Sequence, residues 1–297
     1  MVVSRQSRGV AWLLVLTGFA GGVLAALAIP RAGIGWDAGI DTHAALDVRQ
    51  IPAGASLREA YELVYSTSEF YGVLVQWAAD WIFGLFGGAG PLSPASAVTY
   101  QIQAAVTLAL VVSAVAVASF AVGYLLRSVI AGLFVWATSV TLPFLVGLAV
   151  VDFKDSPIAA AMLMVSSGAA LLWSPRSHRI TVVGSVLIAL GTFIGLGVRI
   201  GAWPLIGMIV AGSAIASVGL SLIAREKAAL LQRVVAPTVG VALGLAGLVL
   251  LNPFARIDLP RWAFDAFTIS RAYPWEGTIR TLGLDLPSSD LPWWYVP

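Results

Sequence analysis

A short charged segment stands between two long apolar runs of this chain. Within residues 151–157, Asp152, Lys154 and Asp155 follow one apolar run and precede the next. Ionisable side chains at a membrane boundary are costly, so such a cluster is a candidate functional site. A carboxylate at this depth suits a general base, because it can accept a proton from an attacking hydroxyl. An ammonium group suits a phosphate leaving group, because it stabilises the charge that develops as the bond breaks.

Three further charged groups are expected on the same face of the membrane. Asp37 and Asp41 follow the first apolar run, and Arg199 ends the fifth. The third group is the polar segment after the seventh run, with Arg256, Arg261 and Arg271. A lipid-linked phosphate would bring its headgroup to this depth while its chain stays in the bilayer. Carboxylates and cations gathered at one face therefore fit the transfer of a sugar from a lipid phosphate.

Each of these residues also has a purely structural interpretation. Asp37 and Asp41 are also typical of solvated loops or helix caps. Lys154 and Asp155 also fit an ion pair at a helix start, and Asp155 fits a cap because Pro157 favours the first helical turn. Arg199 fits a side chain that extends to the headgroups from a helix end. His43 fits a loop residue better than a ligand, and the tryptophans fit a membrane interface before a sugar-stacking surface.

The composition identifies an integral membrane protein. Hydrophobic residues make up 59% of the 297 residues and charged residues only 11%, against about 25% charged in soluble domains. The basic residues form no stripe of the kind that binds nucleic acid. The chain has no cysteine, which excludes disulfides and thiolate metal sites, and its two histidines argue against a histidine-rich metal centre.

Seven apolar runs approach the roughly 20 residues needed to cross about 30 Å of hydrocarbon. We expect spans near 9–30, 97–124, 128–151, 157–173, 180–198, 203–223 and 234–252. The first run also has features of a signal peptide, because Arg5 and Arg8 precede it. Its apolar length and the multispan chain that follows favour a retained helix.

The distribution of charge predicts a cytoplasmic N-terminus. With seven spans, eight basic residues fall in short inner segments, as the positive-inside rule expects. These are Arg5, Arg8, Arg127, Arg176, Arg179, Arg225, Lys227 and Arg233. Glu226 is the one inner acid, so the other 14 of the 15 acids lie outside.

Two large outer segments, 31–96 and 253–297, belong to what we interpret as one transmembrane module over residues 1–297. The first contains apolar and polar residues at helical spacing from Leu57 to Leu85, which indicates amphipathic helices lying in the interface plane. The alternative is a buried eighth span at 70–86. The aromatic residues of 291–297 resemble the interfacial belt that opens another helix, so we expect further C-terminal helices beyond this sequence.

Four local motifs together resemble the polytopic GT-C glycosyltransferases, specifically the bacterial relatives of dolichyl-phosphate-mannose protein mannosyltransferases. The first is the acidic outer loop with Asp37 and Asp41, followed by the aromatic-Gly element Glu69–Gly72. The others are Phe153–Ala159, Gly197–Gly201 and the tail Leu291–Pro297. This chain departs from the family in separating the two loop carboxylates, which are usually adjacent. It also has Asp152 and Phe153 before Lys154, where the family has asparagine and proline.

The resemblance implies an all-α membrane enzyme of the plasma membrane with an extracytoplasmic active site. Its donor would be a polyprenyl-phosphate sugar and its acceptor a protein, lipid or glycan. Asp37 or Asp41 would be the base, Asp155 would position the substrate, and Lys154 and Arg199 would lie near the phosphate. The family elements also make Tyr71, Trp293 and Tyr295 candidate substrate contacts. No cofactor is expected to be obligatory, although some members of the superfamily use a divalent cation.

Two other classes of protein remain as alternatives. A flippase for a lipid-linked saccharide would also hold acids and cations near the membrane. It should show ionisable residues in the middle of its spans, and here they gather at one boundary. A non-catalytic membrane assembly subunit is the third class, and loss of turnover without loss of folding on substitution of Asp37 and Asp41 would argue against it.

Overall fold

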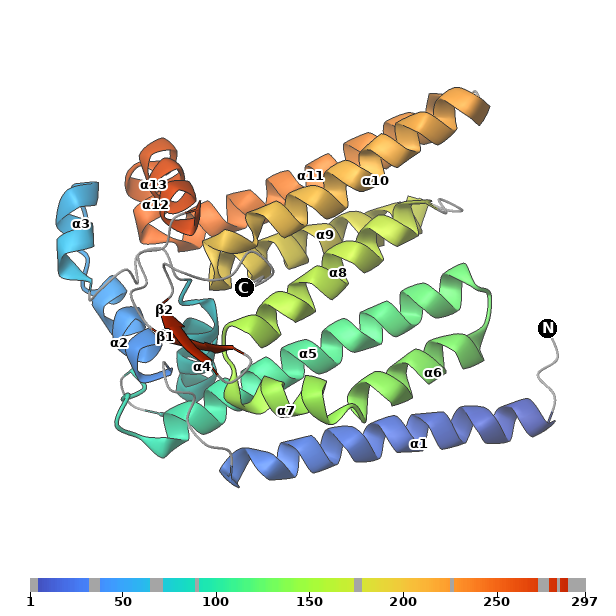
Figure 1. The fold of residues 1–297 in the computed structure, drawn as a ribbon, viewed down its shortest axis with the longest axis horizontal. Coiled ribbons are helices and arrows are strands. Elements are labelled where there is room, and N and C mark those ends of the chain that lie inside the picture. The colour runs from blue at the N-terminus through green and yellow to red at the C-terminus, as the bar shows by residue number, and fades with distance from the viewer. Residues whose placement is uncertain are drawn as a thin grey trace.

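The computed structural model describes residues 5–31, 38–64, 72–88, 91–173, 178–224, 227–271, 278–281 and 284–287. In these residues the chain is helical apart from one short antiparallel hairpin, in which Ile279 pairs with Leu286. Long helices lie side by side as a bundle, and shorter ones gather at one of its ends (Figure 1). The bundle helices are α1 (Arg5–Ala28), α5 (Ala97–Leu125), α6 (Val129–Val140), α7 (Pro143–Val151), α8 (Asp155–Trp173), α9 (His178–Val198), α10 (Trp203–Ala224) and α11 (Lys227–Leu251).

The shorter elements define what we call the capped end of the bundle. They are α2 (Ala38–Arg49), α3 (Leu57–Leu63), α4 (Leu74–Leu85), α12 (Pro253–Ile257) and α13 (Leu259–Arg271), with the hairpin β1 (Thr278–Thr281) and β2 (Leu284–Pro287). Single 3₁₀ turns, η1 (Ile29–Arg31) and η3 (Ile200–Ala202), follow α1 and α9. The opposite end, which we call the turn end, holds the start of α1 and the α5–α6 connection.

The described helices confirm a multi-pass membrane protein. Five are long and apolar enough to cross a bilayer: Gly9–Arg31, Ala97–Leu125, Asp155–Trp173, His178–Val198 and Arg233–Leu251. Trp12 and Phe19 on α1 are more than 60% exposed, as lipid-facing positions are expected to be.

The expected count of seven spans is not confirmed. The run at 128–151 forms two helices, α6 and α7, which bend by 50° at the break and count as a sixth span only if taken together. Pro143 opens α7, and its ring together with its missing N–H disfavours one continuous helix there. The run at 203–223 forms α10, whose described apolar stretch, Trp203–Gly219, is shorter than the five spans above and is not counted with them.

Glycine allows close packing at the centre of the bundle. A Cβ added to Gly168 of α8 would lie 2.6 Å from the carbonyl oxygen of Gly184 on α9. On the other side of α9, a Cβ on Gly244 of α11 would lie 2.6 Å from the carbonyl oxygen of Ala189. Helix α9 is therefore held by α8 and α11 at backbone contact, an arrangement common between membrane helices.

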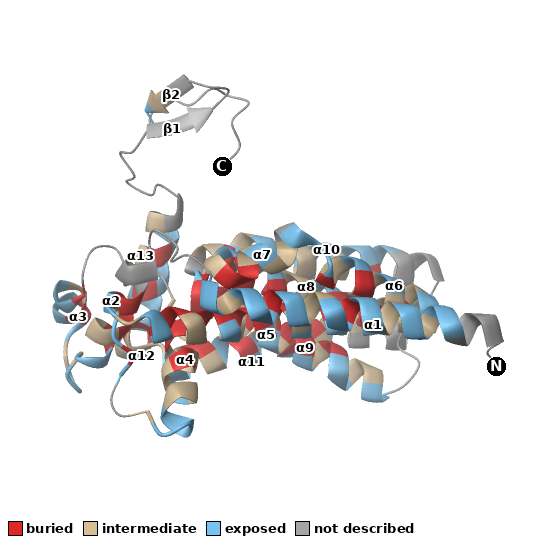
Figure 2. Ribbon diagram, turned by 90° about the horizontal axis from the view of Figure 1, so that it is seen from below, coloured by how far each residue is buried: buried red, intermediate tan, exposed pale blue. Residues whose placement is uncertain are grey.

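The capped end is built around its own apolar core. Trp262 of α13, Phe254 of α12 and Leu57 of α3 are buried together with Leu196 of α9 and Leu248 of α11. Figure 2 shows buried residues continuing from the bundle into this end. The short helices are thus packed against the ends of the long ones.

Helix α4 is too short to be an eighth span. Its 12 residues, at 1.5 Å each, extend about 18 Å, well short of the hydrocarbon thickness. It leaves the bundle crosswise, as α13 does (Figure 2). Trp81, Leu85 and Phe86 are exposed at its far end. This geometry agrees with an amphipathic helix at the interface and argues against the alternative of a span at 70–86.

Candidate functional site

The turn between α7 and α8 is organised by Asp152. One carboxylate oxygen of Asp152 accepts hydrogen bonds from the backbone N–H groups of Lys154, at 2.9 Å, and Asp155, at 2.8 Å. These N–H groups lie at the start of α8 and have no acceptor within the helix. Asp152 therefore caps the start of α8, and Asp155 is the first residue of that helix.

Asp155 meets Arg199 across two helices. The Nη1 atom of Arg199 lies 3.5 Å from Oδ1 of Asp155. Arg199 follows the last residue of α9, where its N–H still donates to the Gly195 carbonyl at 3.0 Å. The two side chains are 46% and 71% exposed, so the pair is open to solvent or to a ligand. The structure thus brings together two of the expected site residues.

An apolar layer supports the pair from below. Phe153 is 4% exposed and packs in a cluster with Tyr100 of α5, Val150 of α7 and Val198 of α9. Phe153 immediately precedes Lys154, and Val198 immediately precedes Arg199. Their burial therefore holds the backbone of Lys154 and Arg199 at the end of the bundle.

Gly72 joins the aromatic-Gly element to the end of α9. Its backbone N–H donates to the carbonyl of Val198 at 2.9 Å, one residue before Arg199. A Cβ at position 72 would overlap the carbonyl of Gly197, so only glycine fits this contact. Two motifs that lie far apart in the sequence therefore form one contact beside the charged pair.

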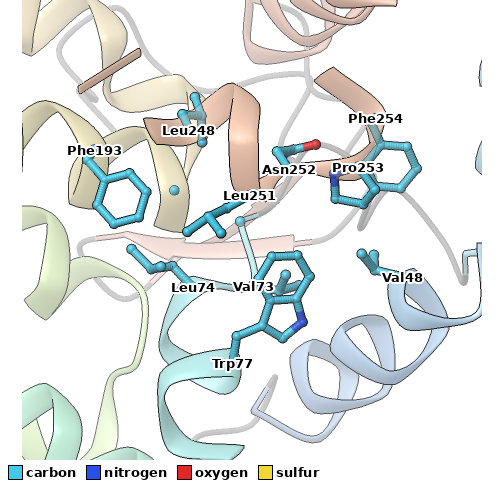
Figure 3. A pocket seen from close by; sticks show the side chains of 12 residues that line it. Val48, Val73, Leu74, Trp77, Phe193, Leu248, Leu251, Asn252, Pro253 and Phe254 are labelled. Atoms are coloured by element: carbon cyan, nitrogen blue, oxygen red, sulfur yellow. The ribbon is translucent and has the colours of Figure 1, made fainter. Parts of the chain in front are cut away.

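A small cavity lies behind this contact (Figure 3). Its volume is about 20 Å³, close to the space of one water molecule. Gly72, Trp77, Gly197, Leu248 and Asn252 are among its lining residues. The indole N–H of Trp77 is buried and has no hydrogen-bond partner among the described residues. The cavity is too small for a sugar.

The carboxylate-bearing helix α2 is fixed to α5 by a buried hydrogen bond. Gln103 Nε2 donates to Thr42 Oγ1 at 3.1 Å, and the two residues are 1% and 3% exposed. Asp41 precedes Thr42 in the first turn of α2, although its side chain lies outside the described residues. Asp37 also lies outside them. The backbone at Asp41 is therefore placed at the capped end.

The remaining expected site residues divide into two groups. Tyr71, Trp293 and Tyr295 lie outside the described residues. In the segment expected as a polar outer loop, the structure instead contains α12, α13 and the hairpin. Arg256 is exposed on α12, and Arg261 lies 4.0 Å from Asp265 on its own helix. His43 is exposed on α2.

One ion pair at the capped end was not predicted from the sequence. Asp80 of α4 is 8% exposed and lies 2.7 Å from Arg49 of α2. Its other oxygen accepts a hydrogen bond from the Leu92 N–H at 2.9 Å. The sequence feature that could have predicted it is an aspartate within a strongly apolar helix, because in a membrane protein such a carboxylate indicates a paired cation or hydrogen-bond donor.

The described residues contain no group of three or more His, Asp or Glu side chains arranged to hold a metal ion. At the edge of the capped end, Glu59 has a pKa below its ordinary value of 4.5. The Ser56 N–H, which donates to Glu59 at 2.7 Å, is the main cause, and the Ser56 hydroxyl adds to it. This is a capping box at the start of α3, a structural role.

Comparison of the chain with protein families, with curated proteins and with solved structures finds no match. The class of protein that the structure defines is therefore a multi-pass α-helical membrane protein with a charged cluster at one end of its bundle.

Proposed function

We propose that this protein is a membrane glycosyltransferase of the GT-C type, which transfers a sugar from a polyprenyl-phosphate donor to an acceptor outside the cytoplasm. The observation that carries the proposal is the Asp155–Arg199 pair, 3.5 Å apart and exposed at the capped end. A guanidinium at a membrane boundary is suited to a lipid-linked phosphate, which it can bind through two parallel hydrogen bonds.

The reaction would be a direct displacement at the anomeric carbon. The acceptor oxygen forms a bond to that carbon while the bond to the phosphate oxygen breaks, which inverts the anomeric centre. Asp37 or Asp41 takes the proton of the acceptor hydroxyl as general base. The electron pair of the broken bond leaves on the phosphate, where Lys154 and Arg199 stabilise it. No cofactor is required for this bond exchange, and we expect chelation of divalent cations to leave the rate unchanged.

Asp155 would act as a positioning residue in this scheme. In the described structure its carboxylate engages Arg199, and an arriving phosphate would compete for the same guanidinium. The expected substrate contacts Tyr71, Trp293 and Tyr295 complete the proposed site. The acceptor is a protein, lipid or glycan, and the enzyme would lie in the plasma membrane of a bacterium with its N-terminus in the cytoplasm.

The positions of charge in the described spans favour an enzyme over a flippase. Helix α5 contains no Asp, Glu, Lys or Arg, and α8 contains only Asp155, at its first residue. In α9 the one such residue is Arg179, in the first turn. A saccharide crossing the membrane would need polar partners part-way along such helices.

The test is transfer of a radiolabelled sugar from a panel of polyprenyl-phosphate sugars, in membranes that contain the full-length gene product. Variants Asp37→Asn, Asp41→Asn and Arg199→Gln are compared with Arg58→Gln, which removes an exposed cation of α3 elsewhere at the capped end. Loss of at least 100-fold in one Asp variant and in Arg199→Gln, with Arg58→Gln unaffected, supports the proposal. Lipid-linked sugar that appears on the opposite leaflet without transfer would instead identify a flippase.

A further inference from the structure

A second feature, far from the charged cluster, is an apolar groove between α5 and α6. Its volume is about 540 Å³, within the range of small-molecule sites. Gly123 and Gly132 form its floor, where a Cβ on Gly132 would lie 2.6 Å from the Ser119 carbonyl oxygen. Phe120 and Tyr124 stack along the α5 wall with ring centroids 6.1 Å apart.

The groove faces outward within a membrane-spanning region. Phe120 and Val129 in its wall are 51% and 72% exposed. The hydroxyl of Ser119, a polar group in the wall, donates to the Val115 carbonyl at 2.7 Å and is thereby satisfied. The lining is thus apolar, and in a bilayer such a groove adjoins acyl chains.

A cation lies in the turn that follows the groove at the turn end. The α5–α6 turn begins where the Ser128 N–H donates to the Gly123 carbonyl at 2.9 Å, and Arg127 stands within it. Arg127 is exposed and has a φ of 52°, a left-handed conformation that directs this residue out of the helical path. The groove, which Tyr124 and Val129 line on the two sides of this turn, therefore lies next to a segment that carries a guanidinium.

We propose that this groove binds an anionic phospholipid, with an acyl chain between α5 and α6 and the phosphate at Arg127. Charge complementarity favours this occupant over a second copy of the chain. The turn end also carries Arg179 and Arg233, so two copies placed side by side would bring like charges together. A phosphate headgroup placed at Arg127 meets that guanidinium with opposite charge. The site is independent of the proposed sugar transfer.

The experiment is native mass spectrometry of the full chain in detergent, with equal amounts of phosphatidylglycerol and phosphatidylcholine that carry the same acyl chains. We expect the protein to retain phosphatidylglycerol preferentially. Arg127→Asn removes the charge and tolerates the positive φ. It should lower this preference about fivefold, since one basic residue near an anionic surface contributes about that factor. The matched control Arg179→Asn removes an exposed cation on the same side and should keep the preference.

A second variant tests the acyl chain. Ala116→Phe fills the groove from an exposed wall position and should lower retention of both lipids. Phosphatidylglycerol with a photoreactive acyl chain should label residues 116–136. Equal loss in the Arg127 and Arg179 variants, or label spread evenly over all helices, would overturn the proposal. Dimers that Ala116→Phe dissociates, with lipid retention unchanged, would overturn it in favour of a second copy.

Discussion

The Asp155 carboxylate lies 3.5 Å from the Arg199 guanidinium, although 44 positions separate the two residues in the chain. Both side chains are substantially exposed, so their attraction is weakened by solvent. We expect Asp155→Asn to change the free energy of unfolding by less than about 1 kcal/mol. Unfolding by SDS titration in micelles measures this, with Arg58→Gln, from another exposed pair, as the control. A larger loss would make the pair structural and weaken its assignment to the site.

Asp152 should behave in the opposite way. Asp152→Ala removes the acceptor of two backbone N–H groups at the start of α8 and should cost about 1 kcal/mol of stability. Asp152→Asn keeps an acceptor oxygen and should recover most of the loss. The same SDS titration distinguishes the two variants, and equal loss in both would show that the charge matters more than the cap.

Gly72→Ala should disturb the site through the backbone. The added Cβ overlaps the Gly197 carbonyl, so the contact between residue 72 and the end of α9 must open. We expect a stability loss of roughly 1–3 kcal/mol and, if the proposed transfer holds, about a 100-fold loss of rate. Gly84→Ala in α4 is the matched control, because its Cβ would meet nothing within 4 Å. Similar effects of the two changes would contradict the close contact.

The Arg49–Asp80 pair should contribute to the attachment of α2 to α4. Arg49→Ala leaves an 8% exposed carboxylate without its cation, at a cost of roughly 1–3 kcal/mol. The double variant Arg49→Ala with Asp80→Asn should be more stable than Arg49→Ala alone, because it leaves no charge unpaired. A double-mutant cycle on the unfolding free energies measures the coupling, and additive effects would show that the ions do not interact.

Glu59 gives a pH dependence at the start of α3. Its pKa in the folded chain is lowered, so the ionised carboxylate stabilises the capping box above the ordinary value of 4.5. That contribution is lost as the pH falls through the lower, folded pKa. We expect the NMR shift of the Ser56 amide to titrate with a midpoint below 4.5. Glu59→Gln retains an acceptor and should abolish this titration, and a midpoint above 4.5 would contradict the capping geometry.

Local pattern predicted the long helices well. The expected span at 97–124 is α5, Ala97–Leu125, and that at 180–198 is α9, His178–Val198. Apolar length determines such helices, because backbone groups in hydrocarbon must pair within the segment. The break between α6 and α7 was missed because the apolar run continues through it, although Pro143 marked the place.

The site was predicted less completely, because contacts between distant segments decide it. Lys154, Asp155 and Arg199 could be named as ionisable residues at span ends. That Asp152 caps α8 depends on the backbone path of the turn, and that Gly72 binds the Val198 carbonyl depends on how two helix ends meet. The partner of Asp80 was equally hidden, since Arg49 lies 31 positions earlier in the chain. None of these pairings has a characteristic spacing that can be recognised in a single sequence.

The backbone contacts that hold α9 determine which part of the cluster can shift. Helix α9 packs closely against α8 and α11 through glycines, so it has little freedom to slide or rotate without steric overlap. The position of Arg199 at its end is therefore fixed. Asp155 begins α8, which is packed against α9 at backbone contact, whereas Asp41 lies on a short helix outside the bundle. If a ligand draws the acidic and basic groups together, we expect the Asp41 segment to move while Asp155 and Arg199 keep their positions.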